Sequence, residues 1–246
     1  MSKRPIQHVS KAKPRSESQA IRSPKAQMFE QFALVAKAVG HGNRLELVEH
    51  MAQGERSVEN LAGLSGLSVA NASQHLQRLR RAGLVMLRRA GTHIYYRLAD
   101  DEILALIAVM RRVAERNLAE VDRVVSGYYH ARDSLEPVSR RELLRRMREE
   151  AVTILDARPM AEYMTGHVPG ARNITPAELE ERLVELGGDR EIVAYCRGAY
   201  CVFSFEAVAL LRRHGFKARR LEEGFPEWKA AGLPVAKGAA RGFAEH

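Results

Sequence analysis

The chain has 246 residues, of which 46% are hydrophobic, so it is long enough and apolar enough for two globular domains. Its formal net charge is +9, and its two cysteines are too few for a scaffold built on disulfides. Neither a charged leader followed by an apolar segment nor a long apolar run is found in the sequence. We therefore expect a cytoplasmic protein with reduced thiols and no membrane partner.

The N-terminal segment, residues 1–26, is strongly basic. Seven Lys and Arg residues stand against Glu17 alone, and Pro5, Pro14 and Pro24 interrupt any regular pattern. This composition predicts a disordered basic arm. Such an arm can contact phosphate or a membrane surface, and in many proteins it only aids solubility.

Helical spacing of apolar residues begins at Met28 and is interrupted by Gly40 and Gly42. A second helix is expected over about 43–51. Ser57 then precedes a short third helix, because Ser is a favoured N-cap and an acidic residue, Glu59, follows it.

A glycine-containing turn at 64–68 separates the third helix from a fourth over 69–82, which is the helix-turn-helix arrangement. Val69, Ala72, Leu76 and Leu79 are expected to form its buried face. The second helix of such a pair enters the major groove, where amide, hydroxyl and guanidinium groups bind bases and phosphates. A solvated polar face is the alternative. The side chains expected to contact DNA here are Ser68, Asn71, Ser73, Gln74, His75, Gln77 and Arg78.

Two β-prone runs flank residues 90–92 and predict a basic hairpin, or wing, with Arg88, Arg89 and His93 as further DNA contacts. A long helix over about 101–126 then carries more apolar residues than so small a domain can bury. We expect a homodimer that covers them and matches a palindromic double-stranded DNA operator. Docking of this helix on the C-terminal domain is the alternative.

The order of these elements resembles the ArsR-type winged-helix repressors over about residues 28–125. The residues that carry the resemblance are 61–62, 73–76, 79–85 and the hairpin from Arg89 to Leu98. The resemblance implies a DNA-binding regulator that acts as a repressor and dimerises through its terminal helices. Metal-sensing members carry cysteines before the turn, but residues 58–64 have none, and Asp101, Asp122 and His130 lack a paired spacing. We expect no metal site and no cofactor.

Strands and helices alternate in the C-terminal half, which predicts an α/β domain with a parallel sheet over 138–236. A linker is expected over 127–137 and a tail over 237–246. The expected helices span 139–150, 176–186 and 205–214, and the expected strands span 152–158, 192–195 and 218–221. With an N-terminal winged helix-turn-helix domain over 27–126, mostly α with a β-hairpin, the chain as a whole is of the α/β class.

Cys196 follows the strand at 192–195 and precedes a glycine-containing loop and a helix. Backbone amides and the positive end of a helix dipole favour the thiolate there, so Cys196 is a candidate nucleophile. The reactive site of an open α/β sheet lies at the carboxyl ends of its strands. A buried structural thiol is the alternative, since free cysteine is often buried. Asp156 and Arg158, at the end of the neighbouring strand, are expected to hold the loops together.

Four motifs in order resemble a single-domain rhodanese over about residues 138–236: 155–158, 166–171, Tyr195–Cys196 and 224–228. The resemblance implies that Cys196 accepts sulfane sulfur from thiosulfate or a polysulfide and becomes a persulfide. Gly198, Ala199 and Tyr200 would form the supporting loop, and Arg197 would bind an anionic donor. Cys201 at the sixth loop position departs from the usual pattern. It is either a resolving thiol that forms a disulfide with Cys196 or an ordinary buried thiol.

Three functions compete. The chain is a DNA-binding regulator governed by a sulfur-accepting domain, or a sulfurtransferase in which the winged helix provides localisation or dimerisation, or a regulator with an inert C-terminal module. The helix-turn-helix, the wing and the basic arm favour the first, because a sulfurtransferase needs none of them.

Overall fold

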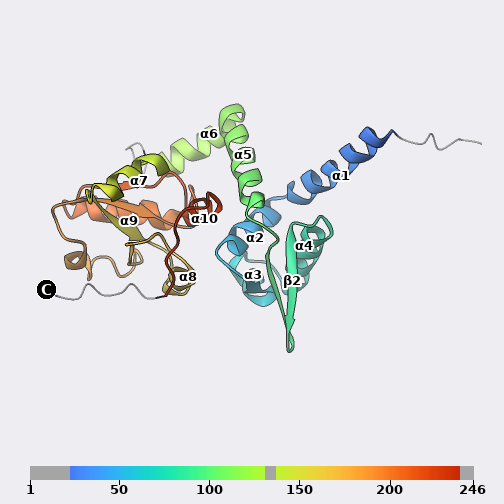
Figure 1. Ribbon diagram of the computed structural model, residues 1–246, viewed down its shortest axis with the longest axis horizontal. Helices are drawn as coiled ribbons and strands as arrows, with labels where there is room; N and C mark the ends of the chain where they lie inside the picture. The colour runs from blue at the N-terminus through green and yellow to red at the C-terminus, as the bar shows by residue number, and fades with distance from the viewer. Residues whose placement is uncertain (1–22, 131–136, 239–246) are drawn as a thin grey trace, which may run out of the picture.

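The structure is a computed structural model that describes residues 23–130 and 137–238, and it consists of two domains side by side (Figure 1). Residues 1–22 of the expected arm and residues 239–246 of the expected tail lie outside the described residues. Residues 24–26, expected in the arm, form the first turn of helix α1. The N-terminal domain comprises α1 (Pro24–Val39), α2 (Gly42–Ala52), β1 (Arg56–Ser57), α3 (Val58–Leu64), α4 (Val69–Arg81), β2 (Val85–Ala90), β3 (His93–Leu98) and α5 (Glu102–Asn117).

The helix-turn-helix begins each of its helices with a serine cap. Ser57 Oγ accepts a hydrogen bond from the amide of Asn60, and Ser68 Oγ accepts one from that of Asn71, so each satisfies a free N–H of a first turn. Gly66, with a φ of 62°, makes the turn between α3 and α4. The pair packs on α2 through residues that are almost fully buried, including Leu47, Leu61, Leu76 and Leu79.

The expected wing is present as an antiparallel hairpin of β2 and β3. The sequence analysis missed a third strand: the short β1 pairs with β3 on its other edge, with Arg56 opposite Tyr96 and Ser57 opposite Tyr95. The base of the wing is thereby fixed to the segment that follows α2.

The expected helix over 101–126 is interrupted, which corrects the prediction. Helix α5 ends at Asn117, whose side-chain amide donates to the carbonyl of Val113 at 2.7 Å and so competes with the helical N–H for that acceptor. Leu118 is extended, and α6 (Ala119–Val124) and a π-helix (Val125–His130) follow. The first part of the expected linker is therefore helical, and residues 131–136 lie outside the described residues.

The C-terminal domain is an α/β unit whose four strands are all parallel, in the order β5-β4-β6-β7, which confirms the expected fold class. Figure 1 shows helices on both faces of the sheet. Its elements are α7 (Arg140–Arg148), β4 (Val152–Asp156), α8 (Met160–Thr165), β5 (Arg172–Asn173), a 3₁₀ helix (Leu183–Leu186), β6 (Glu191–Tyr195), α9 (Val202–Arg213), β7 (Ala218–Arg220) and α10 (Phe225–Ala230).

The expected α-helix over 176–186 is wrong, because this segment forms turns that end in the short 3₁₀ helix. The Arg182 amide bonds to the carbonyl of Leu179, and the Glu185 amide to that of Arg182, which is the i to i+3 pattern of a tighter coil. Leu179 and Leu186 are buried against the sheet. Tertiary packing here overrides the helix propensity of the segment.

The domains meet where α10 lies beside α5 and the sheet's carboxyl edge approaches the end of α2 (Figure 1). None of the described helices is long and apolar enough to cross a membrane.

Candidate functional site: a cysteine pair at the domain boundary and a DNA-reading surface

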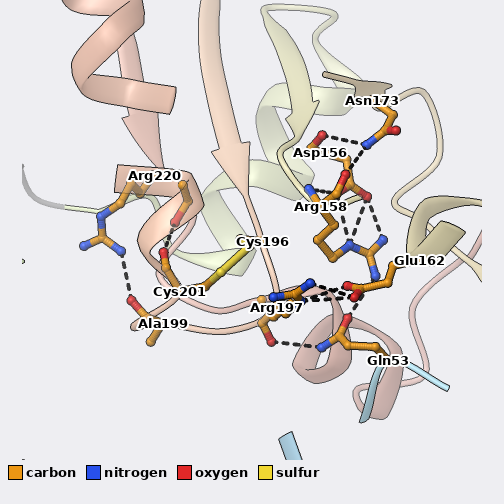
Figure 2. Close-up of a disulfide and its surroundings, with 12 residues drawn as sticks. Gln53, Asp156, Arg158, Glu162, Asn173, Cys196, Arg197, Ala199, Cys201 and Arg220 are labelled. Atoms are coloured by element: carbon orange, nitrogen blue, oxygen red, sulfur yellow. Dashed lines mark hydrogen bonds and ion pairs between the residues drawn. A yellow bond between two sulfur atoms is a disulfide. The ribbon is translucent and has the colours of Figure 1, made fainter. Parts of the chain in front are cut away.

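Cys196 lies directly after β6, at the carboxyl edge of the sheet, and is only 1% exposed. The segment 197–200, called the sulfur loop below, leads from it to Cys201, the N-cap residue of α9. A disulfide joins Cys196 and Cys201, whose Cα atoms are 6.1 Å apart (Figure 2). That separation lies within the range that a disulfide spans without backbone movement.

A buried ion pair supports the site from β4. Arg158 donates to both carboxylate oxygens of Asp156, with Nη2 2.6 Å from Oδ2, and neither side chain is exposed. The register of β4 and β6 sets Asp156 opposite Tyr195, whose hydroxyl donates to the same Oδ2 at 2.5 Å. Burial, and then the Asp156 carboxylate, raise the pKa of Tyr195 well above its ordinary value, so the hydroxyl keeps its proton.

The chain returns to the sulfur loop just before α10. The amide of Phe225 donates to the carbonyl of Cys196 at 3.0 Å. A Cβ atom on Gly224 would lie only 2.6 Å from the Cα of Gly198, so only glycine allows this close approach of two backbones. The motif at 224–228 thus fixes the loop that carries the thiol.

Glu162 on α8 binds two arginines from different domains, and the sequence analysis missed it. Arg197 of the sulfur loop donates to Glu162 Oε1 at 2.8 Å and to Oε2 at 3.0 Å. Arg56, from β1 of the winged-helix domain, donates to the same Oε1 at 2.9 Å. Arg197, expected to bind an anionic donor, therefore has its guanidinium on a carboxylate in this structure (Figure 2).

Two further winged-helix residues meet the site. The side chain of Gln53, only 4% exposed, accepts from Arg158 Nη1 at 3.1 Å and donates to the carbonyl of Arg197 at 3.4 Å. The hydroxyl of Tyr200 donates to Glu115 on α5. No sequence motif indicated these contacts, because they join residues that are far apart in the chain.

Arg220 contacts the sulfur loop on the side that faces away from Glu162 and Gln53. Figure 2 shows Arg220 and Ala199 on that side, away from Glu162 and Gln53. Arg220 donates to the carbonyl of Ala199 at 3.3 Å, and its guanidinium lies 3.8 Å from the ring centroid of Phe205. Within residues 23–130 and 137–238, no group of three His, Cys, Asp or Glu side chains could hold a metal ion.

The polar surface expected to read DNA lies on α4. Asn71, Gln74, Gln77 and Arg78 are exposed, and Ser73 is half-buried. The Ser68 hydroxyl serves as the helix cap. On the wing, Arg89 and His93 are exposed, whereas Arg88 makes a two-pronged ion pair with Glu55 and stacks on Tyr95.

His75 corrects the expected surface, because it is only 5% exposed and faces the domain interior. Residues 72, 75, 76 and 79 are the buried positions of α4, which is the i, i+3, i+4, i+7 pattern of one helix face. Val69, expected on the buried face, is 49% exposed. The His75 ring lies 4.7 Å from that of His41, and burial is the main cause of its lowered pKa. In this structure His75 therefore packs against the core and is not part of the exposed polar surface of α4.

Comparisons with known proteins match each half of the chain. Residues 41–86 match the bacterial regulatory protein, arsR family, and residues 139–231 match the rhodanese-like domain. The HTH-type transcriptional regulator Rv0324 of Mycobacterium tuberculosis is 45% identical over 221 residues, which are 90% of this chain and 97% of the relative. A sulfurtransferase of Allochromatium vinosum is 32% identical over 87 residues, 35% of this chain and 79% of that protein.

Among solved structures, a homodimeric winged helix-turn-helix DNA-binding domain of Mb0332 from Mycobacterium bovis is 41% identical, with a TM-score of 0.37. The match covers 39% of this chain and 90% of that one. Taken together with the fold, the relatives define the class: this is an HTH-type transcriptional regulator. The chain belongs to the arsR family and carries a rhodanese-like domain at its C-terminal end.

Proposed function

We propose that this regulator senses sulfane sulfur, by accepting it on Cys196 and changing its affinity for operator DNA. The observation that carries the proposal is the position of Cys196 and Cys201 on a loop that also contacts the winged-helix domain. A simple sulfurtransferase would not need this contact.

The chemistry has two steps. The Cys196 thiolate attacks the sulfane sulfur of thiosulfate, the S–S bond of the donor breaks, and sulfite leaves, so that Cys196 carries a persulfide. With a polysulfide, the leaving group is the shortened polysulfide. The Cys201 thiolate then attacks Cys196 Sγ, the bond to the outer sulfur breaks, and sulfide leaves with that electron pair and takes up a proton. The two thiols are oxidised to the disulfide, and the sulfane sulfur is reduced.

For DNA, we propose that a homodimer binds a palindromic duplex through α4 and the wing. Exposed apolar side chains on α1 and α5 support a dimer, because a monomer would leave them in water. They are Met28, Phe29, Phe32, Leu34, Val109 and Val113. Lys and Arg contacts release counterions from phosphate, so affinity falls steeply as salt rises.

The test combines mass spectrometry with gel shifts on DNA from upstream of the protein's own gene. Polysulfide adds mass in steps of one sulfur to wild type, and cyanide removes it. Cys196→Ser loses the adduct, whereas Cys201→Ser keeps the persulfide and cannot form the disulfide. Unchanged operator affinity after verified modification of Cys196 would contradict sensing.

Two variants separate the recognition of DNA bases from contacts with the phosphate backbone. Gln74→Ala reduces discrimination between operator and scrambled DNA by about 1–3 kcal/mol where the amide reads a base. Arg89→Ala weakens binding to all duplexes alike, because it contacts phosphate. Equal wild-type affinity for operator and scrambled DNA would contradict sequence-specific binding.

The alternative function is a sulfurtransferase, and the likeness to the sulfurtransferase of Allochromatium vinosum favours it over an inert module. Steady-state transfer of sulfur from thiosulfate to cyanide separates the two functions. An enzyme turns over many times per chain, whereas a sensor needs only one event.

A further inference from the structure

The sulfur loop is also a surface on which the winged-helix domain docks. The carbonyl of Arg197 accepts from Gln53 at the end of α2, and the hydroxyl of Tyr200 donates to Glu115 on α5. These two loop residues therefore contact two different helices of the DNA-binding domain. A change in loop conformation alters both contacts at once.

Glu162 provides the ionic part of this docking. Arg56 Nη2 and Arg197 Nη2 lie 2.9 Å and 2.8 Å from the same oxygen, Glu162 Oε1. The three side chains are 19%, 17% and 7% exposed for Arg56, Arg197 and Glu162. Little water screens them, so each guanidinium strongly affects how the other is held. Glu49 also lies near Arg197, whereas the hydrogen bonds of the Arg197 guanidinium go to Glu162.

Arg56 connects this ion pair to the wing. Its backbone, in β1, pairs with Tyr96 in β3, the second strand of the wing. Its Nε also donates to the carbonyl of His50 at 3.1 Å, near the end of α2. A movement of Arg56 is thus transmitted by backbone pairing to the hairpin expected to contact DNA.

We propose that Glu162 couples the sulfur state of Cys196 to the wing, with Arg197 as the residue that responds to sulfur and Arg56 as the residue that moves the wing. A persulfide on Cys196 places an anion on the residue next to Arg197 and competes with Glu162 for its guanidinium. A disulfide to Cys201 instead restrains the loop that carries Arg197. The interaction of Glu162 with Arg56 therefore differs between the persulfide form and the disulfide form of Cys196. The inference rests on the proposed acceptance of sulfur at Cys196.

Hydrogen–deuterium exchange tests the coupling in the full chain. Exchange is compared between reduced protein, polysulfide-treated protein and disulfide-bonded protein, with each state verified by intact mass. Wild type shows a severalfold change in exchange over 50–57 and 93–98 between states. Arg56→Gln accepts sulfur as wild type does and loses the change over 93–98. Arg145→Gln is the matched control, because Arg145 also makes ion pairs with carboxylates, those of Glu142 and Glu149, but lies on α7, within the rhodanese-like domain.

The outcomes separate this inference from the proposed function. Unchanged wild-type exchange over 93–98 after verified modification overturns the coupling, and this readout requires no folded variant. An Arg56→Gln protein that responds as wild type does overturns the role of Arg56. A responsive wing with unchanged operator affinity supports the coupling and contradicts the proposed sensing.

Discussion

Asp156 and Arg158 form the innermost support of the sulfur site, since their side chains have no exposed surface and bond each other and their surroundings. Breaking such a pair leaves a charge buried without its partner. The sequence indicated both residues through their position at a strand end. It did not indicate Glu162 and Gln53, because each binds an arginine that lies more than a hundred residues away in the chain, Arg56 for Glu162 and Arg158 for Gln53.

We expect Asp156→Asn to destabilise the rhodanese-like domain by about 3 kcal/mol, since Arg158 then keeps its buried charge without a counter-charge. Urea unfolding followed by the fluorescence of Trp228 measures this, because Trp228 is the chain's single tryptophan and is buried in that domain. Asp189→Asn, at an exposed position of the same domain, is the control and should change stability by less than about 0.5 kcal/mol. Equal losses of stability in Asp156→Asn and Asp189→Asn would contradict the role of Asp156 as the counter-charge of Arg158.

His75 gives the winged-helix domain a pH dependence. Burial lowers the pKa of His75 in the folded state, and His41, Arg44 and Arg78 lower it further. In the unfolded chain the pKa of His75 is about 6.5. Between the folded-state and unfolded-state pKa values, the unfolded chain binds more protons than the folded chain. The free energy of unfolding therefore falls as the pH drops from 7.

Replacing His75 with Gln should flatten that fall, measured by urea unfolding and circular dichroism at pH 7 and pH 5.5. Gln77→Asn, an exposed substitution on α4 that changes no titratable group, should leave the slope as in wild type. A slope that stays the same in His75→Gln would show that other groups, such as the half-buried His50, cause the pH dependence.

For whole helices and strands, a sequence pattern predicts some elements correctly and others wrongly. The Ser57 cap and the acidic first turn predicted α3, the spacing of apolar residues predicted α4, and the β-prone runs predicted the wing. The segment 176–186 has the same apparent helical pattern, but the fit of Leu179 and Leu186 to the sheet decides its conformation. In α4 the buried residues are 72, 75, 76 and 79, whereas the expected set had Val69 in place of His75, so the buried face is rotated around the helix from its expected position.

The turn before α10 supports a prediction about the sulfur loop. Gly224→Ala pushes a methyl group into the backbone of Arg197 and Gly198, so the loop must move. We expect a loss of about 1–3 kcal/mol in the stability of the rhodanese-like domain and much slower sulfur loading of Cys196. Gly188→Ala, where an added Cβ meets nothing within 4 Å, is the control. Normal loading in Gly224→Ala would show that the loop tolerates displacement.

For the whole molecule, the apolar face of α1 predicts the oligomeric state. Phe32 is 58% exposed in the single chain, and a dimer would bury it. Sedimentation velocity should give a dimer for wild type and a shift towards monomer for Phe32→Glu. Val184→Glu, at an 89% exposed position in the other domain, should remain dimeric. A monomeric wild type would contradict the dimer.

The arrangement of the two domains could not be read from the sequence, because it depends on polar contacts between surfaces that each domain could equally expose to water. Gln53, Arg56 and Glu115 follow no periodic pattern, and only the folded chain brings them to the sulfur loop.

The docking contacts between the domains are mostly polar, and they belong to one polypeptide. A tether between two domains gives each an effective concentration in the millimolar range at the other. A contact too weak to form between separate proteins can therefore form within one chain. Weak contacts also open readily. In the proposed sensor, one covalent tether lets each protomer respond to its own cysteine pair with no diffusible messenger. We expect that response to be independent of protein concentration as long as the oligomeric state is constant.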